Sequence, residues 1–103
     1  MKRNYMRSIP KEWRAMAKVF VALGDEHRQR ILLTFDAGER LTVGQIAEVA
    51  TLSRPAVSHH LKILRQAGVL VAERSGREVF LQVNRKLLED ALGTVLDYIR
   101  AEA

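Results

Sequence analysis

Hydrophobic residues recur along this chain with two different periods. From residue 9 to Gly68, and again after Asn84, they recur about every 3.6 residues, which is typical of amphipathic helices. Between residues 69 and 83 apolar and polar residues alternate instead, which is typical of strands. The pattern predicts four helices, a β-hairpin and a final helix, so the expected fold class is mainly α with a two-stranded hairpin.

The first two predicted helices meet at Gly24. The first opens after Pro10 and stops at Gly24. The second begins at Asp25, a good N-cap, and has Glu26 in its first turn, where the helix dipole favours an acid. The expected apolar stripe of the first helix is Ile9, Trp13, Met16, Ala17, Phe20 and Leu23, and the expected buried side of the second is Ile31, Leu32 and Phe35.

The stretch from Thr42 to Gly68 predicts a helix-turn-helix. Thr42 and Gln45 have the spacing of a capping box, so a helix should begin there. Ser53 is a good N-cap for the next helix, and Pro55 in its first turn loses no hydrogen bond. Gly68 supplies a left-handed stop. Two helices this short and this closely joined form a helix-turn-helix.

The second helix of this unit has one apolar and one basic side. At about 100° per residue, Val57, Leu61 and Leu64 form a buried seam. The other side is polar and basic without an acid, and its candidate DNA-binding residues are Ser53, Arg54, Ser58, His59, Lys62, Arg65 and Gln66. A helix that enters the major groove needs such donors and cations, although a merely solvated face is the simpler alternative.

The alternating region predicts a hairpin with a basic tip. Its strands are expected at residues 69–74 and 77–83, around Ser75-Gly76. A hairpin after a helix-turn-helix is a wing, so the predicted fold is a winged helix-turn-helix of five helices and a two-stranded wing. Arg74 and Arg77 are candidate contacts to the DNA backbone, and an ordinary exposed turn is the alternative.

Both terminal helices carry more apolar surface than a small core should cover. Asn84 is the expected cap of the last helix. A homodimer would bury the excess through Trp13, Met16, Phe20, Leu88, Leu92, Val95, Leu96 and Ile99. Symmetry would place the two basic helices about 34 Å apart, or a multiple of that distance, facing a pseudo-palindrome. Alternatively, Trp13, Met16 and Phe20 line an effector pocket.

Composition limits the possible functions. The 103 residues, 48% of them hydrophobic, suffice for one domain, expected at 9–103 behind a flexible basic arm at 1–8. A net charge of +5 favours a polyanionic partner. The chain has no cysteine, which excludes disulfides and thiolate metal sites. Without an apolar run that spans a bilayer or a signal peptide, we expect a cytoplasmic protein with no membrane partner and no cofactor.

The histidines and serines of the basic helix raise two further possibilities. His59 and His60 point about 100° apart on a helix, so they are poorly placed to share a metal ion, and we expect no metal site. His60 lies beside the apolar seam and is expected to be packed. Ser58 beside His59 has no third group to orient the imidazole, so we expect no enzyme. His27 is most simply a surface residue.

Three segments together resemble the arsenic-repressor (ArsR) family of winged-helix repressors. They are VFVALGDEHRQRILLTF, IAEVATLSRPAVSHHLKILRQAGVLVAER and GREVFLQVN, within residues 13–100. The resemblance implies a homodimer built from the terminal helices. It also implies operator binding by residues 53–66 with help from the wing, and repression relieved by a signal.

The chain departs from that family at its metal ligands. Thr42 and Gly44 stand where thiolate-type members carry a CxC pair. The last helix has acids but no histidine, where other members place a second metal site. Glu26-His27 replaces the Pro-Thr that usually follows Gly-Asp. Neither family metal site is therefore expected, and the consequence of the last change is open.

We therefore predict a homodimeric transcriptional repressor that binds double-stranded DNA in a sequence-specific manner. It is not expected to be regulated through metal thiolates. Its effector, a small molecule or a protein if one exists, is not specified by the sequence. The alternative is a winged-helix module whose basic face binds an acidic protein. The absence of acids from the basic helix together with the two wing arginines favours DNA.

Overall fold

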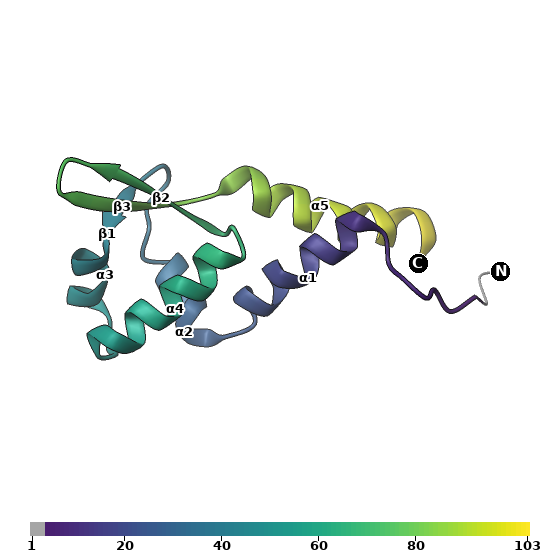
Figure 1. The fold of residues 1–103 in the computed structure, drawn as a ribbon. Helices are drawn as coiled ribbons and strands as arrows, with labels where there is room; N and C mark the ends of the chain where they lie inside the picture. Colours follow the sequence, from purple (N-terminus) through teal and green to yellow (C-terminus); the bar gives the residue numbers. More distant parts are fainter. Residues whose placement is uncertain (1–3) are drawn as a thin grey trace.

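The computed structural model describes residues 4–103 and contains five helices and a small sheet (Figure 1). The elements in chain order are α1 (Lys11–Leu23), α2 (Glu26–Leu32), β1 (Arg40–Thr42), α3 (Val43–Val49), α4 (Arg54–Gln66), β2 (Leu70–Ser75), β3 (Glu78–Val83) and α5 (Arg85–Glu102). The five predicted helices and the winged helix-turn-helix fold are confirmed. Ile9 precedes α1, and Phe35 follows the end of α2, where it still packs against the core.

The sheet has three strands, so the prediction of a two-stranded wing was wrong. Their order is β1-β3-β2, with both neighbouring pairs antiparallel. β1 pairs Leu41 with Leu81, a residue far along the chain. Three residues directly before a capping box carry too short a pattern to predict a strand, and only the edge of β3 makes them one.

Most helix starts carry the caps that the sequence predicts. Asp25 accepts hydrogen bonds from the backbone N–H groups of His27 and Arg28 at 2.9 and 3.1 Å. Thr42 and Gln45 form both bonds of the capping box. The Asn84 side chain accepts from the N–H of Leu87 at 3.2 Å and caps α5. These helices therefore begin where local side chains satisfy their free N–H groups.

The core draws on all five helices and on β2 and β3, and the predicted stripe of α1 faces it only in part, through Trp13, Met16 and Leu23. Met16, Val19 and Ala22 are the buried residues of α1, whereas Ala17 and Phe20 are exposed. Met16 is only 6% exposed in the single chain. It is therefore a core residue of the protomer and has little surface left to offer a second chain, contrary to its predicted place in a dimer interface.

The molecule is elongated, measuring 54 × 24 × 21 Å. The wing lies at one end, whereas the start of α1 and the C-terminus lie at the other, where α5 runs beside α1 (Figure 1). Residues 1–3 of the predicted basic arm lie outside the described residues, and residues 4–10 form neither helix nor strand. Within residues 4–103, no helix combines the length and hydrophobicity that crossing a bilayer requires.

Candidate nucleic-acid interface

The polar side of α4 is open to solvent along its whole length. We call it the recognition surface, and it consists of Ser53, Arg54, Ser58, His59, Lys62, Arg65 and Gln66, every one of them exposed. α4 contains no acid in its thirteen residues. Val57, Leu61 and Leu64 on the opposite side are at most 3% exposed. The predicted division of this helix into a buried seam and a basic outer face is therefore present.

Both ends of α4 are held by local contacts. Ser53 Oγ accepts from the N–H of Ala56 at 3.3 Å. At the other end, Gly68 has the expected left-handed backbone, with φ of +81°. The N–H groups of Gly68 and Val69 return to the carbonyls of Arg65 and Leu64, which is a Schellman ending. The left-handed backbone is the main reason for glycine at this position, because a Cβ on Gly68 would lie 2.7 Å from Leu87 Cδ1, an atom at the end of a side chain that can shift.

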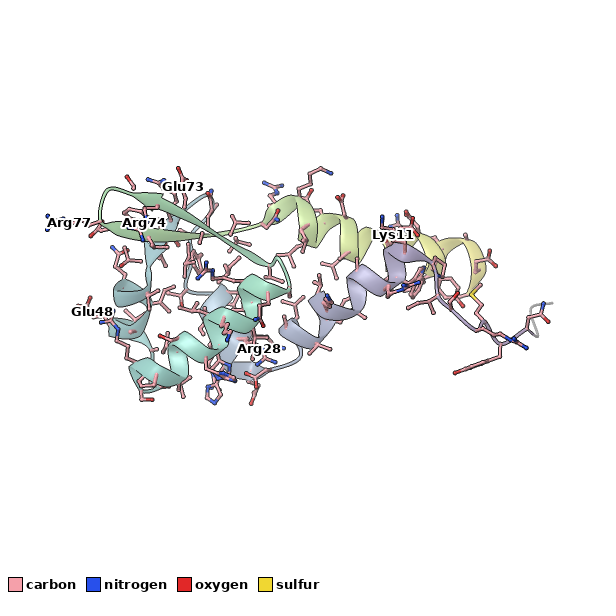
Figure 2. The ribbon with its side chains drawn as sticks, viewed as in Figure 1. Lys11, Arg28, Glu48, Glu73, Arg74 and Arg77 are labelled. Atoms are coloured by element: carbon pink, nitrogen blue, oxygen red, sulfur yellow. The ribbon has the colours of Figure 1, made fainter. Side chains whose placement is uncertain are left out.

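Both arginines of the wing are exposed, and Arg74 lies on the sheet face of its partner Val79 and of the buried Leu81. Arg74 lies near the end of β2 and Arg77 in the turn that follows, and Figure 2 shows Arg77 at the outer tip of the hairpin. Glu73, the residue before Arg74, forms an ion pair with a different arginine, because it accepts a hydrogen bond from Arg40 Nη1 of β1 at 3.2 Å. Arg40 also stacks over the ring of Phe80, 4.8 Å from its centroid. Strand β1 thus braces the wing and partly neutralises an acid beside its basic tip.

Five cations of the two predicted contact regions have no ion-pair partner among residues 4–103. They are Arg54, Lys62, Arg65, Arg74 and Arg77. The first two cations of α5 are paired instead, Arg85 with Glu89 at 2.6 Å and Lys86 with Asp90 at 3.0 Å. Positive charge at the recognition surface and the wing is thus available to an external anion.

A hollow of about 590 Å³ lies between the recognition surface and the base of the wing. Lys62, Arg65 and Gln66 line it from the helix, and Leu70, Val71 and Ala72 line it from β2. Two of its lining side chains are cationic and none is acidic. The sugar-phosphate backbone of a duplex is a ligand of suitable charge for a basic hollow beside a recognition helix.

The histidines are arranged differently from the simplest expectation. His27 is half-buried, and its ring centroid lies 5.6 Å from that of His60, so it is not simply a surface residue. His60 is packed as expected and contacts Arg28, whose Nη1 is 3.3 Å from its Nδ1. Burial lowers the pKa of His60, and the carboxylate of Asp25 acts in the opposite direction. Among residues 4–103, no three histidine or acidic side chains are grouped so that they could hold a metal ion.

The terminal helices leave an apolar surface exposed in the single chain. Phe20 is 38% exposed, and Leu92, Leu96 and Ile99 are 43–51% exposed. Trp13, Leu88 and Val95 are half-buried, and Trp13 packs edge-on against Tyr98 at 5.5 Å. An open cavity of about 410 Å³ between α1 and α5 is lined by Met16, but not by Trp13 or Phe20. This cavity is therefore not the predicted effector pocket of Trp13, Met16 and Phe20.

Two features of the interface were not predicted from the sequence. Arg40 neutralises Glu73 beside the wing, and Arg28 reaches α4 from α2. Both contacts join residues more than thirty positions apart. The one local signal was the absence of a basic residue in the last turn of α1, which left its carbonyl groups in need of a donor from elsewhere.

Comparison with known proteins agrees with this geometry. The family model for a helix-turn-helix domain matches residues 23–73. The chain is 38% identical over 84 residues to the transcriptional repressor SdpR of Bacillus subtilis, an alignment that covers 82% of this chain and 92% of SdpR. An ArsR-like transcriptional regulator from Rhodococcus sp. RHA1 superposes with a TM-score of 0.78 and 30% identity, covering 87% of this chain and 83% of that one. The chain belongs to the ArsR family.

Membership in the ArsR family makes this protein a DNA-binding transcriptional regulator. A solution structure from Mycobacterium bovis, described as a homodimeric winged helix-turn-helix DNA-binding domain, has the same fold. Its TM-score is 0.67 at 22% identity, and it covers 95% of this chain and 96% of that domain. No finding favours the alternative of a module that binds an acidic protein.

Proposed function

We propose that this ArsR-family protein is a homodimeric repressor that binds a pseudo-palindromic operator in double-stranded DNA. In this proposal the recognition surface of each protomer enters the major groove, with Arg54, Ser58 and His59 near base edges. Lys62, Arg65 and Gln66 grip the backbone beside the hollow, and Arg74 and Arg77 grip it at the wing.

The observation that carries the proposal is the set of five cations on α4 and the wing that have no ion-pair partner within residues 4–103, with no acid on α4. Duplex DNA carries a phosphate charge about every 1.7 Å of its axis, so each exposed cation can replace a condensed counterion. The relatives named as transcriptional regulators support the same conclusion.

We also propose that α1 and α5 form the dimer interface through Trp13, Phe20, Leu88, Leu92, Val95, Leu96 and Ile99. Phe20, Leu92, Leu96 and Ile99 leave apolar surface of these two helices in water. The homodimeric domain from Mycobacterium bovis, which has this fold, supports the arrangement. A two-fold axis there would present two recognition surfaces to one face of the duplex.

Release from DNA would require a signal other than a thiolate-bound metal, because the chain contains no cysteine. Three kinds of signal fit this condition: a small molecule, a partner protein, and the concentration of the repressor itself. The cavity between α1 and α5 is the place where a small molecule would reach the proposed interface.

The proposal is tested with the full chain and the DNA upstream of its own gene. Fluorescence anisotropy compares that DNA with a random duplex of equal length at several salt concentrations, and footprinting locates the protected site. We expect tighter binding to the upstream DNA and two protected half-sites related by two-fold symmetry. Equal affinity for both duplexes at every salt concentration would refute the proposed sequence specificity.

A further inference from the structure

The C-terminal end of α1 is closed by side chains from α2. Arg28 Nε donates to the carbonyl of Ala22 at 2.7 Å, and Arg28 Nη2 donates to the carbonyl of Val21 at 3.1 Å. Gln29 Nε2 donates to the carbonyl of Leu23 at 2.7 Å. A cation at this position also opposes the negative end of the α1 dipole. α1 and α2 are therefore joined by three side-chain hydrogen bonds.

The third nitrogen of Arg28 reaches the recognition helix. Arg28 Nη1 lies 3.3 Å from Nδ1 of His60, a half-buried residue of α4. A guanidinium has only donors, so Nδ1 of His60 must accept, and the imidazole is then neutral with its proton on Nε2. Figure 2 shows Arg28 where α2, α4 and the end of α1 meet. One planar side chain thus contacts two other helices at once.

We propose that Arg28 is a positioning residue for operator recognition: it holds α4 at a fixed orientation to α1 and so sets the separation of the two recognition surfaces. This inference rests on the proposed function, because α1 lies in the interface only in the proposed dimer. Arg28 itself need not contact DNA, since all three of its guanidinium nitrogens already bind groups of this chain. Lysine cannot replace it, because an ammonium lacks the planar fork that serves three partners in different directions.

Three charged or titratable groups lie beside the contact between Arg28 and His60. They are Asp25, the N-cap of α2, His27 of α2 and His59 of α4. The rings of His27 and His59 are centred 5.6 and 5.7 Å from that of His60. Burial, which favours the neutral imidazole, lowers the pKa of His60. The acceptor is therefore present at neutral pH and is lost when acid protonates Nδ1.

The closing experiment compares Arg28→Lys with Gln29→Ala. Both changes remove side-chain bonds to the end of α1, but only Arg28 reaches α4. We expect Arg28→Lys to weaken operator binding about five- to thirtyfold, with unchanged affinity for random duplex and an unchanged dimer by sedimentation. Gln29→Ala should keep the affinity of the original chain for both duplexes. An equal loss in both variants, or none in Arg28→Lys, would overturn the inference.

His60 supplies a second test of the same link. His60→Gln retains an acceptor and should keep operator affinity, whereas His60→Leu should lose as much as Arg28→Lys. The double variant Arg28→Lys/His60→Leu should lose no more than Arg28→Lys alone, because His60→Leu removes only a contact that Arg28→Lys has already removed. Losses that multiply would show that the two residues act independently and would contradict the link.

One measurement does not depend on DNA. Because the chain has no cysteine, spin labels can be placed on Lys11→Cys at the start of α1 and Arg54→Cys at the start of α4. The labelled chain is diluted with unlabelled chain, so that each distance lies within one protomer. Arg28→Lys should broaden this distance distribution, and Gln29→Ala should not. An unchanged distribution in Arg28→Lys refutes the positioning role, whereas a failure to prefer upstream DNA refutes the proposed function.

Discussion

The two ends of this molecule expose surfaces of opposite chemistry. At one end, the exposed side of α4 and the wing carry cations that no acid of the described residues 4–103 pairs with. At the other end, the exposed side of α5 carries Leu92, Leu96 and Ile99, while its first two cations are paired with its own acids. Both helices are amphipathic, but α4 buries its apolar side within the protomer and α5 leaves much of its apolar side in water. The difference indicates that one end suits a polyanion and the other a second apolar surface.

The largest effect on operator binding is expected from a charge placed at the apolar end. Leu96→Glu, at a site 43% exposed in the single chain, places a charge in the proposed interface. We expect a monomer in sedimentation and a loss of operator affinity of about 100-fold, because simultaneous binding of two half-sites is lost. Leu33→Glu is the control, since Leu33 is 84% exposed near the end of α2. A Leu96→Glu variant that remains dimeric would place the interface elsewhere.

The next largest effect concerns base reading at the cationic end. Arg54→Ala should reduce operator affinity by about 1–3 kcal/mol and relax the preference at one base pair, if Arg54 reads a guanine. Binding to a panel of operators, each with one base pair changed, measures both effects. Unchanged preference at every base pair would remove Arg54 from base recognition.

Phosphate contacts should act on all DNA alike. Lys62→Ala and Arg77→Ala should each weaken operator and random duplex to the same degree and reduce the slope of log affinity against log salt by about 0.9. Lys11→Ala, an exposed lysine at the start of α1 (Figure 2), is the matched control and should leave the slope as it is. If the slope of log affinity against log salt is the same in all three variants, Lys62 and Arg77 do not contact phosphate.

The N-terminal caps of α4 and α5 allow the roles of these two helices to be compared directly. Ser53 caps α4 and Asn84 caps α5, each through one bond to a backbone N–H. Replacement of either by alanine should lower the free energy of unfolding by about 1 kcal/mol, measured in urea. Only Ser53→Ala should also weaken operator binding in anisotropy. If Asn84→Ala weakens it equally, the loss reflects stability and not a contact to DNA.

The smallest effect is a pH dependence of stability. Burial lowers the pKa of His60 from its ordinary value of 6.5, so the unfolded chain takes up that proton at higher pH than the folded chain. The contribution is complete above pH 6.5 and declines as the pH falls toward the folded pKa. Urea midpoints at neutral and mildly acidic pH should show a smaller decline in His60→Gln than in the original chain.

The elements that could be predicted from the sequence are those whose signals lie within one turn of helix. The Thr42–Gln45 capping box, the Ser53 cap and the left-handed Gly68 each bind backbone groups three residues away. The periodicity of α4 likewise predicts both its buried seam and its basic face. Local sterics and hydrogen bonding determine these features before any other part of the chain is in place.

The burial of α1 could be predicted only in part. Its periodicity correctly indicates a helix with apolar residues, but α1 has apolar residues on more than one side. Which side faces the core depends on contacts with α2, α4 and α5, and these select Met16, Val19 and Ala22 and leave Phe20 exposed. A helical period cannot choose between two apolar faces, because each satisfies it equally well.

The five helices, the caps of α2 to α5 and the basic face of the recognition helix follow from the sequence alone, because neighbours along the chain supply the interactions involved. Three features depend on the packed fold: residues 40–42 form a strand, Arg40 neutralises Glu73, and Arg28 joins α1 to His60. Each of these features pairs groups more than thirty residues apart. Such pairs form only when the packing of the core brings the two segments together. The pattern of residues within either segment does not indicate which distant segment it will meet.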